Sequence, residues 1–113
     1  MRPRRRKTPK SGIRPAPRIR SPQHLQWVRG HECAARDHSC LGALEAAHVR
    51  SQTNGGMGLK PSDTFAIPLC SRHHREQHSI GEKQFEIRHK IKMLEIAEDL
   101  ARRSPHRTKW EAE

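Results

Sequence analysis

The stretch LEAAHVRSQTNGGMGLKPSDTFAIPLCSRHHREQHS, residues 44–79, decides how this chain is expected to fold. Residues 44–50 predict a short strand, and the Asn-Gly-Gly sequence after them marks a glycine-rich loop that runs through residue 63. Residues 64–69 (TFAIPL) are rich in strand-forming side chains and predict a second strand. Residues 70–79 predict a short helix. The expected order is therefore a two-stranded antiparallel ribbon with a glycine-rich connection, followed by a helix.

The helix expected over residues 70–79 carries metal-ligand side chains where a packing helix would carry apolar ones. Cys70 and His73 are three residues apart and His74 and His78 are four apart, so the members of each pair share a helical face. The two faces are offset around the helix axis. One helix can therefore serve two separate metal ions.

Two more cysteines upstream complete a set that is typical of a structural zinc site. Cys33 and Cys40, taken with Cys70 and His73, provide the three thiols and one imidazole of a closed tetrahedral site. Six residues separate Cys33 from Cys40, more than in a tight zinc knuckle, and either could instead be an ordinary small buried side chain. Three other histidines compete with His73 for the fourth position: His31, His38 and His74.

The composition indicates why such a site is needed. Of the 113 residues, 32% are apolar, 31% are charged and only 4% are aromatic, so one domain with a small core is expected. Domains with so little core usually need a staple such as a metal ion. Three cysteines cannot all pair, and neither a secretory signal nor the run of about 20 apolar residues of a membrane span is evident. We therefore expect a reduced, cytoplasmic setting, where cysteines bind metals more often than they form disulfides.

The net charge of +11 is concentrated at the N-terminus. Residues 1–22 hold seven arginines, two lysines, five prolines and no acid, so the other 91 residues carry a net charge of only +2. The prolines forbid a continuous helix, and we expect a disordered basic arm that binds nucleic-acid phosphates. A solubilising tail or a nuclear address is the alternative interpretation. The arm's expected DNA-binding residues form one cationic run: Arg4, Arg5, Arg6 and Lys7.

The rest of the chain is expected to complete a domain over residues 23–104. Residues 24–29 (HLQWVR) alternate in a way that predicts a short strand. Residues 82–103 have apolar side chains about every 3.6 residues and predict one long amphipathic helix, which closes the core or pairs with a second copy of the chain. Residues 105–113 are expected to be a loose end. The fold class is then α+β, with the two strands and the helix that follows them spanning about residues 44–80.

Three segments, AAHVR, KPSD and IPLCSRHHREQH, resemble the HNH endonuclease superfamily, and more narrowly the small prophage-encoded HNH-like nucleases of the Ref and YbcO kind. The resemblance covers about residues 25–87, and the PLCxxHHxxQH run is its most specific part. It implies a ββα-metal fold and metal-dependent hydrolysis of DNA phosphodiester bonds, often with a separate structural zinc. Resemblance to the recombination-promoting members also implies phage DNA recombination or processing, and cooperation with a recombinase filament.

The resemblance assigns roles residue by residue. His48 matches the first motif histidine, the general base, and an imidazole with a free pKa near ~6.5 suits that role. His74 and His78 match the helix histidines at the catalytic ion, which could be Mg²⁺, Mn²⁺ or Zn²⁺. Cys70 and His73 match the pair at the structural zinc. The ion is expected to contact the scissile phosphate while His48, across from it, takes a proton from the attacking water.

The motif departs from the superfamily pattern at two positions. The acidic residue that often precedes the first histidine is Ala47 here, so a metal ligand is missing unless Asp63 or Glu45 substitutes. The central asparagine of the motif falls near Phe65, and its orienting role is vacant unless Asn54 or Asp63 takes it. We therefore group Asp63 with the general base as a catalytic residue.

Basic residues beside the motif are expected to hold the DNA backbone: Arg50, Lys60 and Arg72. No base-reading element is evident, so sequence-selective cutting is not expected. Two other functions stay open. One is a non-catalytic, zinc-stabilised DNA-binding module, and the other is a zinc-only adaptor that uses its long helix to bind a protein. Metal content distinguishes the nuclease from the binding module, because the nuclease would hold two ions per chain and the binding module one.

Overall fold

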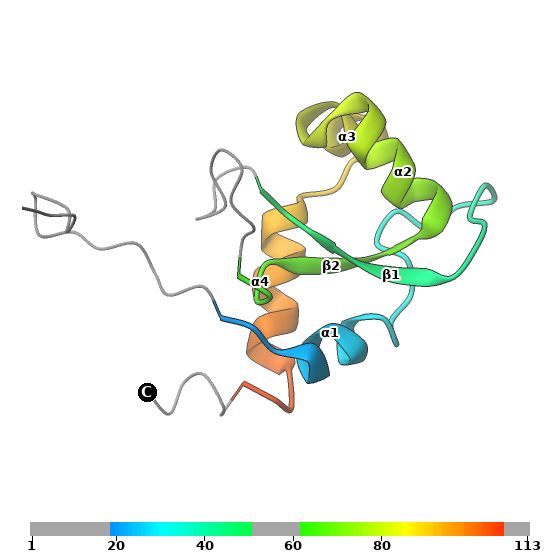
Figure 1. Ribbon diagram of the computed structural model, residues 1–113. Helices are drawn as coiled ribbons and strands as arrows, with labels where there is room; N and C mark the ends of the chain where they lie inside the picture. The colour runs from blue at the N-terminus through cyan, green and yellow to red at the C-terminus, as the bar shows by residue number, and fades with distance from the viewer. Residues whose placement is uncertain (1–18, 51–61, 108–113) are drawn as a thin grey trace, which may run out of the picture.

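The computed structural model describes residues 19–50 and 62–107. The expectations for Arg4, Arg5, Arg6 and Lys7 of the basic arm, for Lys60 and Asn54 of the loop, and for the chain end from residue 108 lie outside these ranges. The described residues form an α+β structure of four helices and one two-stranded sheet, which confirms the expected class (Figure 1). The elements are α1 Pro22–Val28, β1 Leu44–His48, β2 Ala66–Cys70, α2 Ser71–Ile80, α3 Glu82–His89 and α4 Met93–Arg103.

The ribbon of β1 and β2 is antiparallel, as the sequence predicts, with His48 paired to Ala66. Every residue of β2 is buried, because helices cover the strand. Pro68 lacks a backbone donor and is tolerated in a strand only at an edge. A two-stranded sheet consists of two edges, and the Pro68 carbonyl accepts a hydrogen bond from the backbone N–H of Ala34 at 2.7 Å.

The core is small and lies under α3 and α4. Ile67 and Leu69 of β2 are fully buried and pack with Phe85 of α3 and with Met93 and Ala97 of α4. The inner face of α2 buries two polar side chains, His73 and Gln77. Figure 1 shows α2 and α3 on one side of the ribbon and α1 on the other, with α4 against β2. None of the helices in the described ranges is both long and apolar enough to cross a membrane.

The strand expected over residues 24–29 is wrong, because this segment belongs to helix α1. Ser21 is the N-cap, and its side chain accepts a hydrogen bond from the backbone N–H of His24 at 3.1 Å. Pro22 occupies the first helical position, where its missing N–H costs nothing and its fixed φ favours the helix. These two start signals outweigh the short alternation of apolar side chains that suggested a strand.

The single helix expected over residues 82–103 is two helices. Lys90 adopts a left-handed conformation with φ 58° and ends α3, and its backbone N–H bonds to the Glu86 carbonyl. The Glu86 carboxylate then accepts a hydrogen bond from the backbone N–H of Met93, the first residue of α4, at 2.6 Å. Because Phe85 and Met93 enter the same core, the apolar spacing continues across the break and conceals it.

Candidate metal centres and active site

Three elements bring together the Cys/His cluster, which consists of Cys33, Cys40, Cys70 and His73. The first two cysteines lie between α1 and β1, Cys70 ends β2, and His73 lies in the first turn of α2. Their ligand atoms all lie within 4.8 Å of one another, and none of the three cysteines forms a disulfide. Of the histidines that competed for the fourth position, the structure places His73 in the cluster.

The separations within the cluster fit a tetrahedral metal ion. The Nδ1 atom of His73 lies 3.5 Å from Cys33 Sγ, 3.6 Å from Cys40 Sγ and 3.1 Å from Cys70 Sγ. Metal–sulfur bonds of ~2.3 Å and metal–nitrogen bonds of ~2.0 Å at a tetrahedral angle place S and N about 3.5 Å apart. Three thiols and one imidazole also form a donor set that zinc prefers. The cluster could therefore hold a metal ion such as zinc.

The protein environment prepares one of the thiols to ionise. Burial opposes ionisation of Cys70, but hydrogen bonds from the backbone N–H groups of His73 and Leu41 and from the side chains of His73 and Cys40 lower the pKa of its thiol to about 6. Burial is the main reason that the pKa of Cys33 is raised to about 11. Cys70 therefore ionises more readily than Cys33.

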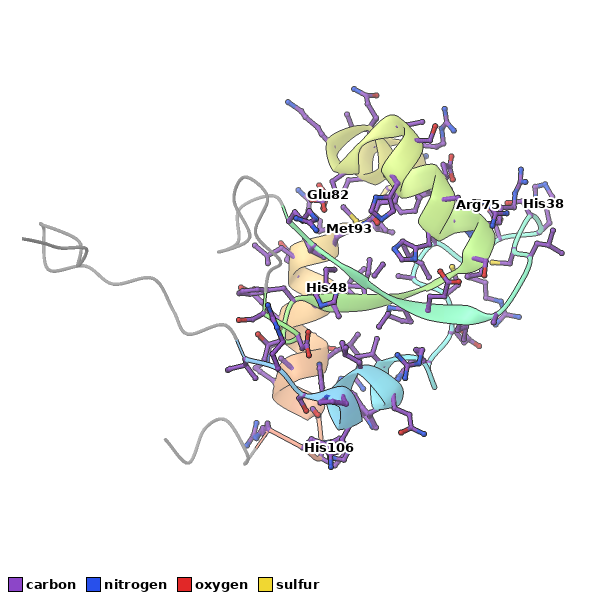
Figure 2. The ribbon with its side chains drawn as sticks, viewed as in Figure 1. His38, His48, Arg75, Glu82, Met93 and His106 are labelled. Carbon is purple, nitrogen blue, oxygen red and sulfur yellow. The ribbon has the colours of Figure 1, made fainter. Side chains whose placement is uncertain are left out.

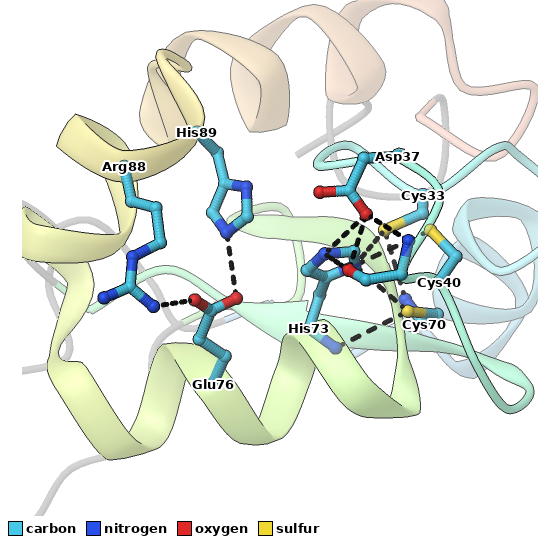
Figure 3. Close-up of polar contacts among 9 residues, drawn as sticks. Cys33, Asp37, Cys40, Cys70, His73, Glu76, Arg88 and His89 are labelled. Atoms are coloured by element: carbon cyan, nitrogen blue, oxygen red, sulfur yellow. Dashed lines mark hydrogen bonds and ion pairs between the residues drawn. The ribbon is translucent and has the colours of Figure 1, made fainter.

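The far side of the His73 ring is also held by polar groups. Its Nε2 atom lies 3.4 Å from a carboxylate oxygen of Asp37 and 3.3 Å from the hydroxyl of Ser39 (Figure 3). Hydrogen bonds from the side chain and backbone of Ser39 lower the pKa of Asp37 to about 2, so this carboxylate is charged. Such partners fix the orientation of a metal-binding imidazole.

A second group of imidazoles lies on a different face of α2. We call His74 and His78 the imidazole pair, and their Nε2 atoms are 3.3 Å apart. Two nitrogens bound at ~2.0–2.1 Å to one tetrahedral ion are separated by about 3.3–3.4 Å, so the spacing fits a shared ion. Within the described residues, no third ligand atom of a His, Cys, Asp or Glu lies within 4.8 Å of both nitrogens. An ion here would keep positions for water or substrate, as catalytic ions do.

Glu45 of β1 supports the imidazole pair. Its Oε1 atom is 2.7 Å from Nδ1 of His74, and its Oε2 atom accepts a hydrogen bond from the hydroxyl of Ser71 at 2.8 Å. These two hydrogen bonds, that of His74 first, lower the pKa of Glu45. A carboxylate that accepts from Nδ1–H leaves Nε2 with its lone pair available, which is the usual outer partner of a metal-binding histidine.

His48, at the end of β1, contacts Asp63 instead. Its Nε2 atom is 2.9 Å from Oδ1 of Asp63, a carboxylate that is only 3% exposed. The backbone N–H of Ser21 donates to the other oxygen of Asp63 at 2.8 Å, and Arg20 lies 3.7 Å from the first. The structure therefore places the two residues grouped as catalytic in direct contact.

His48 and the imidazole pair do not face one another. Successive side chains of a strand point to opposite faces, so Glu45 and His48, three residues apart, lie on different faces of β1. Glu45 is the residue that reaches His74. No hydrogen bond or ion pair among the described residues joins His48 to the imidazole pair, and Figure 2 shows His48 well away from Arg75 of α2. This arrangement departs from the expectation of an imidazole directly across from the ion.

Ala47 shares the Glu45 face of β1 and is completely buried. An acid at that position would enter the core, so Glu45, two residues earlier on the same face, is the acid that meets the helix. Of the two substitutes considered from the sequence, Glu45 lies beside the imidazole pair and Asp63 lies beside His48.

The expected DNA contacts that the structure describes lie apart from each other. Arg72 is exposed on the first turn of α2. Arg50 is exposed after β1, and its backbone N–H donates to the Glu82 carboxylate at 2.7 Å. Both residues are exposed.

No function was expected for His89, yet its ring packs against His73 of the Cys/His cluster. Its ring centroid is 5.0 Å from that of His73 and 4.4 Å from that of Phe85. Its Nε2 atom is 2.9 Å from the Glu76 carboxylate, which also pairs with Arg88 (Figure 3). The i, i+4 spacing of Phe85 and His89 is the only sequence signal of this contact.

Comparison with known proteins finds a family without an assigned activity. A family model described as "Protein of unknown function (DUF968)" matches residues 7–104. The "Uncharacterized protein YdfU" of Escherichia coli (strain K12) is 37% identical over 59 residues, which cover 50% of this chain and 16% of that protein. The chain therefore spans only a small part of this relative's length. No solved structure matches.

Proposed function

Because the chain belongs to the DUF968 family of proteins of unknown function, its activity has to be argued from its own residues, and we propose that it is a metal-dependent DNA endonuclease. One observation carries the proposal. The Nε2 atoms of His74 and His78 lie 3.3 Å apart, and the Glu45 carboxylate holds the first ring by its other nitrogen. The order β1, β2, α2 and the resemblance to HNH nucleases support the same reading.

The chain's own groups would divide the work of phosphodiester hydrolysis as follows. A divalent ion at the imidazole pair would supply positive charge for the scissile phosphate and the departing oxygen. His48 would accept the proton of the attacking water. Because Nε2 of His48 bonds to Asp63, Nδ1 is the atom that is free to take that proton. Asp63 would keep the ring in this tautomer and balance its charge after proton transfer.

The opposite faces of β1 constrain how DNA could lie. A DNA strand whose scissile phosphodiester contacts both the imidazole pair and His48 would have to pass over β1 from one face to the other. If the DNA stays on one face, the imidazole pair and Glu45 form the active site by themselves and His48 has a structural role. The effect of replacing His48 separates these two arrangements.

The test is nicking of supercoiled plasmid with added Mg²⁺ or Mn²⁺. We expect the native chain to nick and the double variant His74→Ala, His78→Ala to lose activity. We expect His48→Ala to be slower by roughly 10²–10⁴-fold, the usual contribution of general base catalysis. His106→Ala, which removes a half-buried histidine after α4 that lies outside both groups and outside the neighbouring cavities, is the control and should nick normally. An inactive native chain, or an active double variant, overturns the proposal.

The separation of His48 from the imidazole pair favours a second candidate, a zinc-stabilised DNA-binding module without catalysis. In that case His74 and His78 share a simple hydrogen bond, which a 3.3 Å separation also allows. Elemental analysis distinguishes the two functions. After equilibration with Mn²⁺ and removal of free ion, two metals per chain support the nuclease, and one metal supports the binding module.

A further inference from the structure

Helix α2 has a third functional face in addition to the two that carry metal-ligand residues. One face carries His73 into the Cys/His cluster, and a second carries the imidazole pair. The third is exposed and follows helical spacing of three and four residues, with Arg72, Arg75 and Ser79 along it. Two cations on an exposed face are common by themselves, so the surroundings of this face decide what it can do.

This third face forms a wall of a cavity of about 620 Å³, and α3 adds Arg88 to the same cavity. We call this cavity the arginine pocket, after Arg72, Arg75 and Arg88. A second cavity of about 610 Å³ contains the imidazole pair and Glu45. Arg75 and Ser79 line both cavities, so the two are neighbours across the α2 surface. Figure 2 shows Arg75 and His38, which also lines the arginine pocket, at the same end of the molecule.

Two of the three arginines are available to a ligand. Among the described residues, the ion pairs of arginines involve Arg20, Arg36, Arg88, Arg102 and Arg103. Arg72 and Arg75 therefore form no ion pair within the described part of the chain, and both are exposed. Guanidinium groups bind phosphate through two parallel hydrogen bonds, which makes arginine well suited to a phosphodiester backbone.

The acids that line the pocket are already engaged by protein groups. Glu76 pairs with Arg88 and with His89, and these contacts outweigh its burial and lower its pKa. Asp37 accepts hydrogen bonds from the backbone and hydroxyl of Ser39. Three arginines against two carboxylates leave the lining with one net positive charge, and Arg72 and Arg75 are its unpaired cations.

We propose that the arginine pocket binds a backbone phosphate of the same DNA chain whose neighbouring phosphate lies at the imidazole pair. This inference rests on the proposed function, and it names how the substrate is held: by non-specific phosphate contacts on one side of the cutting site. Arg75, which lines both cavities, lies on the path between them. The pocket fits an internal stretch of a polynucleotide better than a single nucleotide, because binding and cutting occupy separate neighbouring cavities.

The test measures binding without cutting, by fluorescence anisotropy of a labelled DNA duplex titrated with the full chain, with no added Mg²⁺ or Mn²⁺. The variant is Arg72→Gln, Arg75→Gln. Each phosphate contact contributes a slope of about −0.9 to a plot of log K against log salt concentration, so we expect the slope to become shallower by about 1.8. The affinity at ~0.1 M salt should fall on the order of tenfold or more.

The matched control is Arg29→Gln, Lys92→Gln, which removes the same charge from two exposed residues that do not line the pocket. The slope of log K against log salt concentration for this control should differ from the native slope by less than about 0.9, the contribution of one phosphate contact. The conservative variant Arg72→Lys, Arg75→Lys keeps the charge and should restore the slope. Equal slopes for the glutamine variant and the control, or a native chain that does not bind the duplex, overturn the inference.

The binding measurement, taken together with the nicking assay, distinguishes failure of this inference from failure of the proposed function. A native chain that fails to nick plasmid but binds DNA through Arg72 and Arg75 supports the pocket and overturns the endonuclease. A chain that nicks plasmid and binds DNA equally well with either pair of glutamines supports the endonuclease and overturns the pocket.

Discussion

At the scale of single residues, Glu45 shows how a partner outside the metal-ligand set can define a site. It bonds to His74 at 2.7 Å on the side away from His78, so the ring can offer only its Nε2 atom to an ion. The sequence presents Glu45 as one of two substitutes for a missing acid. The structure shows that its position on the helix-facing side of β1 is what brings it to His74.

Replacing Glu45 therefore tests the imidazole pair without removing either histidine. In Glu45→Gln the shape is kept and the charge is lost, and we expect the affinity for Mn²⁺ to fall by roughly 10–100-fold, as for other outer partners of metal-binding histidines. Isothermal titration calorimetry measures the affinity. Glu98→Gln, an exposed acid on α4, is the control. An unchanged affinity in Glu45→Gln would show that the carboxylate does not support an ion site.

His24 provides a prediction of pH dependence. It is completely buried, with Nδ1 2.9 Å from the Ser104 hydroxyl, and burial lowers its pKa below the ordinary 6.5 although the charge of Asp63 opposes the shift. At a pH between the two values the unfolded chain binds more protons than the folded one. The stability that His24 contributes is therefore fully present above about pH 6.5 and is lost as the pH falls through the lowered pKa.

Urea unfolding at several pH values between 7.5 and 5 measures this dependence. We expect the free energy of unfolding to decrease less steeply towards acid pH in His24→Gln than in the native chain. His38→Gln, which changes an exposed histidine, should follow the native curve. Parallel curves for His24→Gln and the native chain would mean that His24 does not contribute.

At the scale of elements, the junction between α3 and α4 depends on one strained residue. Lys90 has a φ of 58°, a left-handed conformation that costs a non-glycine residue roughly 1–2 kcal/mol. The structure keeps it because it turns the chain so that Phe85 and Met93 both enter the core. A glycine adopts the same backbone conformation without a steric clash, because it has no Cβ.

We accordingly expect Lys90→Gly to raise the free energy of unfolding by about 1 kcal/mol, because the strain is relieved. The larger conformational entropy of glycine in the unfolded chain reduces this gain. Urea denaturation measures the change. Lys83→Gly is the comparison, because Lys83 lies within α3 in the helical conformation that lysine adopts without strain, and it should be destabilising. Equal effects at both positions would argue against strain at Lys90.

At the scale of the whole molecule, metal binding and folding should be one event. The apolar core is small, and the Cys/His cluster ties the loop before β1 to the end of β2 and the start of α2. A structural zinc contributes on the order of 10 kcal/mol to zinc-finger peptides at pH 7. That value is as large as the whole ~5–15 kcal/mol stability of a typical domain.

Removal of the metal with a strong chelator should therefore abolish the cooperative thermal transition of the chain. Circular dichroism during heating measures it, and added Zn²⁺ should restore both the transition and the helical signal. The double variant His74→Ala, His78→Ala keeps the Cys/His cluster and should unfold like the native chain before chelation. A chelated chain that still melts cooperatively at the native temperature would show that the cluster does not stabilise the fold.

Local spacing made several features predictable from the sequence alone. The two strands, the helix after them and the division of His73 and the imidazole pair between two faces of that helix depend only on periods of about 2 and 3.6 residues. The choice of cysteines followed from their number, because a chain with three needs all of them for a closed site. The start of α1 is equally local, because Ser21 caps the helix and Pro22 occupies its first position.

Only the tertiary structure decided how these local pieces meet. Cys33 contacts His73 across 40 residues of chain, Asp63 reaches His48 across 15, and Glu45 reaches His74 across 29. The register of β1 against β2 fixes which side of the ribbon each strand residue faces, and a shift by one residue would reverse every side. Spacing along the chain determines which side chains share a face, whereas contact between faces depends on how distant segments pack, and no local period contains that information.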